Sequence, residues 1–378
     1  MSYDPYSNEW LLNRFDIYKD LRTRDTAYWC EKYQVYVLTR YDDVFFALNN
    51  PQFFSSAQGN LLIEVDERKG KTLGASDNPL HSEYKNIVIN AYTKGNIKRI
   101  ADVFSTKALE LLDNKTEINI SDVTEELAVW LSTEIINSPL NKEEAVELTY
   151  ETHRLQQTQT CRRSLNQPNH PKFRKLFEFV RLKIPHGPGA YNEYVSNNIK
   201  NLDVIALIIG NMMSGPGSMA AALQYLTLDL FYENKLDILL QDRSLIPQAV
   251  NESLRFHAGV GRFTRTITQD ITIHNVNLKS GDRVAICLES ANRDESKWYN
   301  PDEFIINRND TVKHLAWGYG AHACIALAIS KEMLRLYLKL LLDKVGKYEI
   351  LTKPSDLKYV LMYGGNISIM SNIMLRKL

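Results

Sequence analysis

The sequence lacks any uninterrupted apolar run of membrane-spanning length, since the apolar stretch at 204–230 is bounded or interrupted by Asp203, Asn211 and Asp229. The first thirty residues carry charges throughout and contain no apolar segment of signal-peptide or membrane-spanning length, so we expect a soluble protein of the cytoplasm. Cysteine is scarce too, and no two cysteines form a Cys-x-x-Cys pair, which argues against structural zinc and a disulfide framework and fits a reducing cytosol. The four cysteines are Cys30, Cys161, Cys287 and Cys324.

Net charge is also missing. The chain has 45 basic and 45 acidic residues, so nothing in the overall balance predicts nucleic acid or an anionic membrane as a partner. Repeats, low-complexity tracts and linkers are absent, and we expect a single domain over residues 1–378, which is long enough to bury a cofactor. No flavin or nicotinamide fingerprint occurs, so a fused reductase is not expected.

The periodicity of apolar residues predicts a mainly α fold with a small β-sheet region (α+β). Residues 51–76 and 156–171 lack periodicity and are interpreted as long loops. Strands are expected at 35–39 and within 264–285, with a turn at 279–282. Helices are expected at 42–48, in several pieces over 80–155, and at 204–230, 246–256 and 325–342.

The most informative stretch is residues 317–326, Trp-Gly-Tyr-Gly-Ala-His-Ala-Cys-Ile-Ala, which sets Cys324 directly ahead of an apolar helix. A thiolate is the strongly donating ligand that haem iron takes in oxygen-activating enzymes. Glycines let backbone N–H groups approach the charged sulfur, and the N-terminus of the following helix favours the same charge. A lone cysteine beside glycines is more often a small buried hydrophobe, so other motifs must decide.

The loop resembles the haem-binding signature Phe-Gly-x-Gly-x-His-x-Cys-x-Gly of the cytochrome P-450 family. Trp317 stands for the phenylalanine and Ala326 for the last glycine, and the matching positions are Gly318, Gly320, His322 and Cys324. The resemblance extends over essentially the full chain. It implies the cytochrome P-450 fold and a haem b (iron protoporphyrin IX) whose iron is bound by Cys324. The indole N–H of Trp317 either reaches the sulfur and reduces its donation, or the ring simply fills the pocket.

Glu252 and Arg255 are spaced three apart on one helix face, where they can pair with each other and with a third group. By itself this spacing is weak, because such pairs are common on solvated helices. In the family that the chain resembles, a Glu-x-x-Arg pair lies beneath the haem and binds an arginine from the segment before the cysteine loop. The resemblance assigns that role to Arg308.

Haem carries two propionates, and burying them requires cationic partners with good hydrogen bonds. The resemblance nominates four residues for this role: His81, Lys85, Arg265 and His322. His81 and Lys85 match the family's Asp-Pro-Pro-x-His-x-x-x-Arg pattern, with lysine in place of arginine, which keeps the charge but loses the fork geometry. Without the resemblance, His81 would be interpreted as a core or capping histidine and Lys85 as a solvated lysine.

The family's oxygen-binding helix usually reads Ala/Gly-Gly-x-Asp/Glu-Thr, in which the acid and the alcohol relay protons. Residues 214–218 read Ser-Gly-Pro-Gly-Ser, so at the two catalytic positions Gly217 replaces the acid and Ser218 the threonine. Pro216 lacks an N–H, and we expect the helix to open locally there and admit water, although a simple kink is the alternative. The missing acid leaves three outcomes open: water or substrate supplies protons for ordinary hydroxylation, peroxide brings them, or the reaction is a coupling or desaturation.

The resemblance therefore predicts an oxidoreductase that carries out hydroxylation or demethylation type monooxygenation of a small to medium organic substrate. Dioxygen is the oxidant and a ferredoxin or flavodoxin the electron donor, docking on the face nearest Cys324. Residues expected to add positive charge to that face are Lys313, Lys331 and Arg335. A haem protein that binds ligand without turnover is the alternative from another class.

Substrate contacts in this fold come from irregular segments above the haem. Here these are residues 51–76, 154–188, 257–263 and 361–366. An apolar wall is expected from Phe53, Leu61, Leu62 and Ile63, and polar contacts from Arg154, Gln156, Gln157, Arg162 and Arg163. Such arginines more often face solvent. The turn at residues 186–189 is typical of a hinge, or of an ordinary surface turn.

Overall fold

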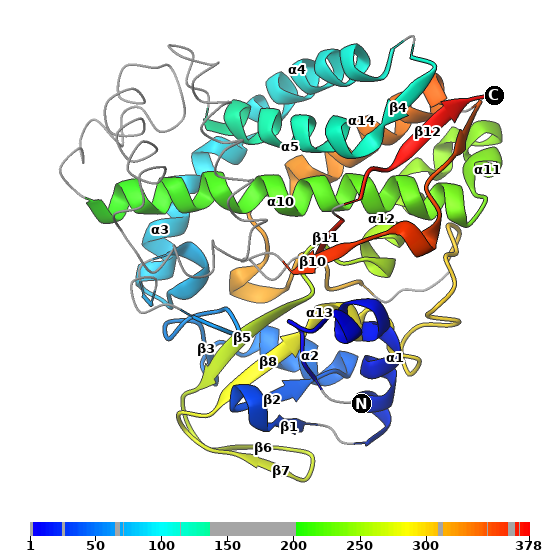
Figure 1. Cartoon of the computed structure of the whole chain (residues 1–378). Helices are drawn as coiled ribbons and strands as arrows, with labels where there is room; N and C mark the ends of the chain where they lie inside the picture. Colours follow the sequence, from blue (N-terminus) through cyan, green and yellow to red (C-terminus); the bar gives the residue numbers. More distant parts are fainter. Residues whose placement is uncertain are drawn as a thin grey trace.

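The structure is a computed structural model (Figure 1). It describes residues 3–24, 27–64, 69–70, 72–113, 115–136, 202–308, 313–345, 347–361, 367–369 and 371–378. Several expected segments fall partly or wholly outside these ranges: part of the loop at 51–76, the end of the helical region at 80–155, the loop at 156–171, the turn at 186–189 and most of the segment 361–366. The polar residues expected to contact substrate between 154 and 163 also lie outside the described residues.

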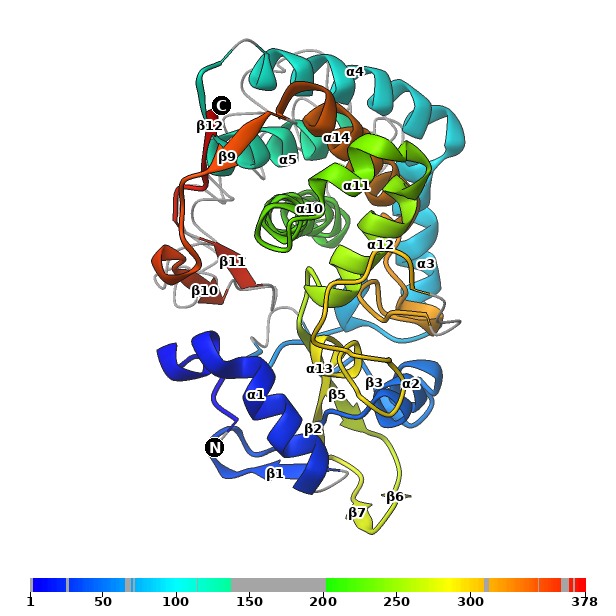
Figure 2. The ribbon, with the colours of Figure 1, turned by 90° about the vertical axis from the view of Figure 1, so that its right-hand side faces the viewer.

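A single long helix, α10 (Leu202–Tyr232), runs through the middle of the molecule. Figure 2 looks along this helix and shows others arranged around it. Almost every described side chain of its second half is buried, which is expected for a helix that is apolar on all sides. The helices around it are α3 (Leu80–Val88), α4 (Lys94–Leu112), α5 (Ile120–Ile136), α11 (Leu236–Gln241), α12 (Ile246–Phe256) and α14 (Leu327–Val345).

The main sheet lies below the helical layer in Figure 1 and has the strand order β1-β2-β8-β5-β3. Strands β2 and β8 pair in parallel and the other pairs are antiparallel. The strands are β1 (Tyr28–Cys30), β2 (Val35–Leu38), β3 (Phe54–Ser55), β5 (Arg262–Ile267) and β8 (Arg283–Cys287). The helices at this end of the molecule are α1 (Asn8–Arg24), α2 (Tyr41–Asn49) and α13 (Leu288–Ala291).

Three smaller sheets complete the described structure. The strand order of the largest of them is β4-β12-β9, and the other two are hairpins. Their strands are β4 (Glu117–Asn119), β9 (Tyr348–Ile350), β12 (Met374–Lys377), β6 (Ile271–Ile273), β7 (Val276–Leu278), β10 (Tyr359–Leu361) and β11 (Ile367–Ile369). Short 3₁₀ turns lie at Glu31–Tyr33, Leu73–Ala75, Ile89–Tyr92, Arg243–Leu245, Gly320–His322 and Pro354–Asp356.

The mainly helical fold with a small sheet is confirmed. The expected helix at 246–256 matches α12. The expected helix at 204–230 matches α10, which begins two residues earlier and ends two residues later. Helix α10 is continuous through Pro216, so the helix assignment does not show the local opening that we expected there. Among the described helices, none combines the length and the apolar character that a membrane crossing requires.

Candidate functional site

The loop before α14 folds back on itself and holds Cys324 at its end. The backbone N–H of Cys324 donates to the carbonyl of Trp317 at 2.8 Å, which closes the loop. Gly318 and Gly320 both have positive φ, 67° and 69°, a conformation that favours glycine. A Cβ on Gly320 would come within 2.7 Å of the carbonyl oxygen of Leu48, so the loop packs against α2 only because this residue has no side chain.

Cys324 is a free, partly buried thiol. Burial raises its pKa, and a hydrogen bond from the backbone N–H of Ala326 acts in the opposite direction. The described residues contain no group of three or more His, Cys, Asp or Glu side chains that could hold a metal ion by themselves. One sulfur ligand therefore suits a metal whose other ligands belong to a prosthetic group, as in haem.

Four cationic or titratable side chains gather beside this loop. His81 and Lys85 come from α3, Arg265 from β5, and His322 from the cysteine loop. The rings of His81 and His322 lie 4.2 Å apart between centroids. Burial, together with the smaller effects of Arg265, His81 and Lys85, lowers the pKa of His322 to about 3. The four groups are thus close enough to repel one another.

This cluster contains more positive than negative charge. Arg265 is 4% exposed, and its hydrogen bond goes to the carbonyl of Thr264, at 2.9 Å, rather than to a carboxylate. Burial lowers the pKa of Arg265 to about 10, and the charge of the Asp77 carboxylate opposes this shift. Asp77 itself accepts hydrogen bonds from Ser55 and Ser56. A buried guanidinium without a carboxylate partner, next to two imidazoles, fits the carboxylates of a bound ligand, such as the propionates of haem.

Trp317 and His314 each bury a ring nitrogen next to the cysteine loop. Within the described part of the chain, neither Trp317 Nε1 nor His314 Nδ1 has a hydrogen-bond partner. Burial lowers the pKa of His314 to about 3, with Lys331 and Arg255 contributing, so the imidazole is neutral. A buried N–H donor without an acceptor is costly, and Trp317 lies in the same backbone-closed loop as the Cys324 sulfur.

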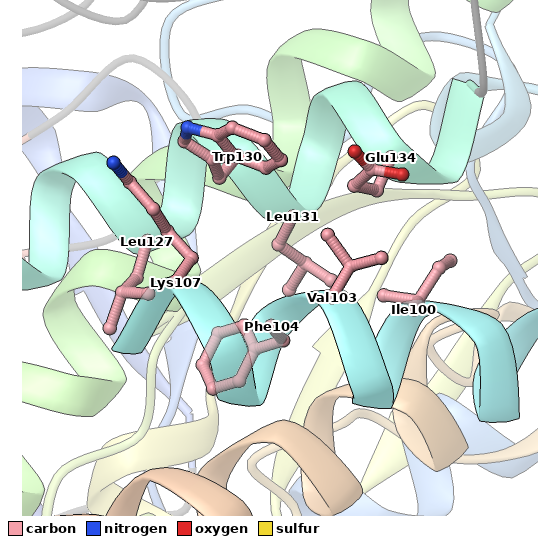
Figure 3. A pocket seen from close by; sticks show the side chains of 8 residues that line it. All are labelled: Ile100, Val103, Phe104, Lys107, Leu127, Trp130, Leu131 and Glu134. Atoms are coloured by element: carbon pink, nitrogen blue, oxygen red, sulfur yellow. The ribbon is translucent and has the colours of Figure 1, made fainter. Parts of the chain in front are cut away.

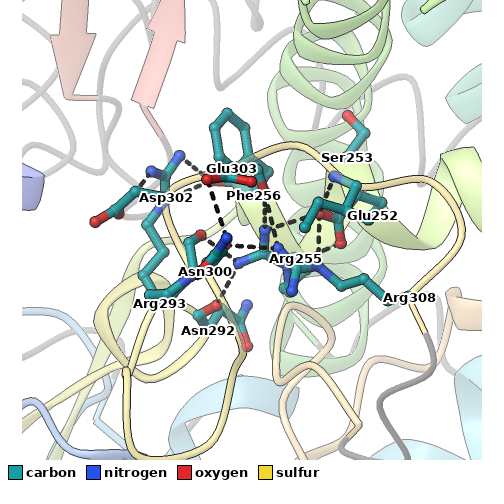
Figure 4. Close-up of polar contacts among 12 residues, drawn as sticks. Glu252, Ser253, Arg255, Phe256, Asn292, Arg293, Asn300, Asp302, Glu303 and Arg308 are labelled. Atoms are coloured by element: carbon teal, nitrogen blue, oxygen red, sulfur yellow. Dashed lines mark hydrogen bonds and ion pairs between the residues drawn. The ribbon is translucent and has the colours of Figure 1, made fainter.

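A buried ion-pair network lies behind the loop (Figure 4). Glu252 Oε1 accepts hydrogen bonds from Arg255 Nη2, Arg308 Nε and the backbone N–H of Ile305, each at 2.8 Å, and Oε2 accepts from Arg255 Nε at 2.8 Å. The side chains of Arg255, Glu252 and Arg308 are 1%, 4% and 8% exposed. The expected contact of Arg308 with the Glu-x-x-Arg pair is therefore confirmed.

The same two arginines organise the irregular segment that leads to the cysteine loop. Their remaining N–H groups donate to main-chain carbonyls of residues 292 and 299–303, which are Asn292, Tyr299, Asn300, Pro301 and Glu303. The side chain of Asn292 in turn accepts a hydrogen bond at 2.6 Å from the backbone N–H of Leu315. Asn292 links the network to the loop, and sequence reasoning did not assign it this role, because only the folded chain brings residues 292 and 315 together.

The expected catalytic positions lie on α10. Ser218 Oγ donates to the carbonyl of Gly215 at 3.1 Å, so part of its hydrogen-bonding capacity is directed to its own helix. A Cβ on Gly215 would meet Ser132 Oγ of α5 at 2.9 Å, which explains a glycine at this close helix contact. Gly217 follows Pro216 within the continuous helix, and the position carries no acid.

Two open spaces elsewhere are separate from these residues. A shallow groove with no room for a water molecule lies between α4 and α5 (Figure 3), with apolar side chains in its middle and charged ones at its ends. It is lined by Ile100, Val103, Phe104, Lys107, Leu127, Trp130, Leu131 and Glu134. A wider surface cavity of about 400 Å³ is lined by Gln58, Glu64, Lys69, Thr266, Gly281 and Arg283. Neither space includes Cys324, the four cations or Ser218.

Comparison with known proteins identifies the group to which this arrangement is similar. A sequence model of the family described as Cytochrome P450 matches residues 238–354. Pulcherriminic acid synthase of Bacillus subtilis is 24% identical over 377 residues, covering 90% of each chain. Cytochrome P450-terp of a Pseudomonas species is 38% identical over 120 residues, which is 32% of this chain and 28% of that protein. Cytochrome P450 CYP109Q5 from Chondromyces apiculatus has a similar fold, with a TM-score of 0.82, 20% identity and coverage of 100% of this chain and 98% of that one.

Proposed function

The chain belongs to the cytochrome P450 family, and on that premise we propose how its own residues bind haem and support oxidation of a substrate. Membership makes the protein an oxidoreductase of the monooxygenase type and implies a haem cofactor. Haem supplies the activation of dioxygen, one atom of which is transferred to an organic substrate. An enzyme is therefore favoured over a haem protein that only binds ligand.

Cys324 binds the iron of a haem b in this proposal. The support is the closed loop that presents the sulfur, together with the start of α14 three residues later, where backbone N–H groups favour a thiolate. Burial raises the thiol pKa, so a positive iron centre is needed to hold the deprotonated form. The buried Trp317 indole N–H makes no hydrogen bond to the Cys324 sulfur in the structure, so in this proposal the ring fills the pocket beside the cysteine loop.

His81, Lys85, Arg265 and His322 hold the two propionates. The observation that carries the proposed site is the buried Arg265 guanidinium beside the cysteine loop. Its hydrogen bond goes to a main-chain carbonyl rather than to a carboxylate, and a carboxylate of a bound group would supply the missing counter-charge. Arg265 offers two parallel N–H donors, whereas Lys85 binds as a single point charge. Lys85 therefore holds its propionate less rigidly than the arginine usual in the family.

Protons reach the distal side by way of water or a substrate group. Gly217 provides no acid, and Ser218 provides a hydroxyl that donates to the helix backbone and can accept a hydrogen bond from a water. Ordinary monooxygenation with dioxygen needs the fewest further assumptions. The absent acid favours, as a second candidate, oxidative coupling, desaturation or a peroxide-driven reaction, because none of these depends on the same proton supply.

The substrate is a small to medium organic molecule, and electrons come from a ferredoxin or flavodoxin in the cytoplasm. A relative that matches most of the chain is named for the synthesis of pulcherriminic acid, which supports a small organic substrate. Lys313 is exposed on the segment before the cysteine loop and adds positive charge for a donor. Arg335 Nη1 lies 3.9 Å from Glu332 Oε2, and this carboxylate reduces the positive charge that Arg335 adds to the surface for a donor. Residues 1–378 form a single domain in this proposal.

The test is the absorption spectrum of the purified protein with dithionite and carbon monoxide. Wild type and Cys30→Ser should show the strongly red-shifted Soret band of a thiolate-ligated haem, and Cys324→Ser should lose it. Cys30 is a suitable control because it is a buried free thiol on β1, outside the cysteine loop, and its Sγ donates a hydrogen bond to the carbonyl of Tyr3. A wild-type protein without haem, or an unchanged spectrum in Cys324→Ser, would contradict the assignment.

A second experiment separates the two candidate reactions. Once a substrate has been found by its spin-state shift, its turnover is compared with dioxygen plus a ferredoxin and ferredoxin reductase, and with hydrogen peroxide alone. Ordinary monooxygenation predicts that the dioxygen system is the faster and yields a hydroxylated or demethylated product. Faster turnover with peroxide, or a coupled or desaturated product, would favour the second candidate.

A further inference from the structure

A second titratable cluster lies where α10 meets the end of α12. Asp229 of α10 is buried, and its Oδ2 accepts a hydrogen bond from Ser253 Oγ at 2.7 Å. Its Oδ1 lies 2.9 Å from Nδ1 of His257, the residue at which α12 ends. The side chains of Asp229 and His257 are 3% and 17% exposed. Because Ser253 donates to the carboxylate and not to the imidazole, the three residues are not a nucleophile triad.

The His257 ring is held by aromatic contacts as well as by its contact with Asp229. It stacks on Tyr225, one turn before Asp229 on α10, with centroids 4.3 Å apart and planes 10° apart. The rings of Phe15 and Phe256 approach it at 5.9 and 4.9 Å. The contact between Nδ1 and Asp229 is outside hydrogen-bond geometry, so it is a close polar contact within a closely packed site.

His257 begins a segment that reaches Ser218. A Cβ on Gly259 would lie 3.5 Å from the carbonyl oxygen of Ser218 and 3.9 Å from its Cβ, so Gly259 packs directly on that residue. Ser218, Tyr225 and Asp229 are spaced by seven and four residues, which places them along one face of α10. One face of the helix therefore holds His257 at one end and contacts Gly259 at the other.

We propose that Asp229 and His257 are positioning residues that fix the segment 258–261 against Ser218, and thereby set the room for ligands beside this part of α10. The inference rests on the proposed function, because that room is ligand space only if haem is bound nearby. The four residues 258–261 read Ala-Gly-Val-Gly and carry little side chain of their own to hold them in place. The pair at the start of the segment then determines where the segment lies.

The electrostatic surroundings keep the ring of His257 neutral near pH 7. Burial lowers its pKa, Asp229 opposes this shift, and Arg293 and Arg14 add to it. The other ionisable side chain against the ring is Tyr225, whose pKa burial raises. The positioning contact therefore joins a carboxylate to a neutral imidazole, and it does not require the ring to be charged.

The test compares Asp229→Asn and His257→Phe with a matched control. Phenylalanine keeps the ring that stacks on Tyr225 and removes both nitrogens. Asp43→Asn is the control, because Asp43 is also a buried carboxylate paired with a histidine, His274 at 3.0 Å, in a different part of the fold. The probes are imidazole and 4-phenylimidazole, which bind haem iron through the same nitrogen but differ in bulk, and their dissociation constants are measured by spectral titration.

We expect the ratio of the two dissociation constants to change by about three- to tenfold in Asp229→Asn and His257→Phe, and to stay within about twofold of wild type in Asp43→Asn. Amide hydrogen exchange of residues 258–261, followed by mass spectrometry, should be faster in the first two variants only. If either the ratio or the exchange of this segment is unchanged in both variants, the inference is overturned. The exchange measurement does not need haem, so it decides the positioning role even if the carbon monoxide spectrum refutes the proposed function.

Discussion

Replacing Glu252 with glutamine tests how much of the stability depends on the buried ion-pair network. Four hydrogen bonds of 2.8 Å converge on this carboxylate from two buried arginines and one backbone N–H. Glutamine keeps the shape but removes the negative charge, and it turns one acceptor into an N–H₂ group that faces guanidinium donors. Both arginines then stay buried without a counter-charge.

The cost follows from the burial of the partners. Removing one member of a buried ion pair typically costs about 3–5 kcal/mol, because an uncompensated charge remains in the interior. Arg255 is 1% exposed and Arg308 8%, and neither can reach water without moving the segments whose carbonyls it binds. The expected loss is therefore about 3–5 kcal/mol, a large share of the roughly 5–15 kcal/mol that stabilises an ordinary protein.

The assay is urea unfolding of Glu252→Gln and wild type, followed by tryptophan fluorescence. Trp298 is a useful reporter because the Arg255 guanidinium lies 5.4 Å from its ring centroid. Asp270→Asn is the control, since it breaks an ion pair of 2.8 Å between two exposed side chains, Asp270 and Lys279, and should leave the midpoint nearly unchanged. If Glu252→Gln unfolds at the same urea concentration as the control, the network does not stabilise the fold as argued here.

Three further predictions concern single side chains. Trp317→Phe should change the haem reduction potential in a dye-equilibrated titration no more than Trp29→Phe at the surface does, because Trp317 Nε1 donates no hydrogen bond to the sulfur in the structure; a fall of some tens of millivolts would contradict this. Burial lowers the pKa of His314 to about 3, so between about pH 6.5 and 3 the unfolded chain takes up a proton that the folded protein excludes. His314 should therefore cost up to about 1.4 kcal/mol of unfolding free energy per pH unit as the pH falls, and urea unfolding of His314→Gln should lack that dependence. Ser218→Ala should slow dioxygen-driven turnover on the order of 10²-fold and leave peroxide-driven turnover of the same substrate intact; equal rates with dioxygen would refute a proton role for this hydroxyl.

Sequence patterns predicted the long helices and the residues that belong to a recognisable motif. The apolar run of α10 and the Glu-x-x-Arg spacing were sufficient to predict a central helix and a buried ion pair, because each is a local pattern with one dominant explanation. Strand β4 was missed since it is only three residues long and its partner β12 lies far along the chain. Short strands are defined by their pairing more than by their composition.

The residues expected to bind propionates and the Asp229–His257 contact show the same limit at the level of sites. The spacing of residues 81 and 85 places both on one helix face, but nothing in the sequence brings residues 265 and 322 to them; only the resemblance to a family named the four, and the fold brings them together. The contact between α10 and the end of α12 has no motif, and sequence reasoning did not find it. Its members are recognised from burial and from the 2.9 Å separation, which depend on how two helices pack.

The parallel pairing of β2 with β8 has a consequence for the order in which the protein is made. Val37 lies opposite Ala285, so the strand at 35–38 stays without its neighbour on that side until residue 287 has left the ribosome. Closing so long a loop is slow, and meanwhile an unpaired, apolar strand edge is exposed to other nascent chains. We therefore expect production in cells to be limited by chaperone capacity and improved by slower synthesis at lower temperature.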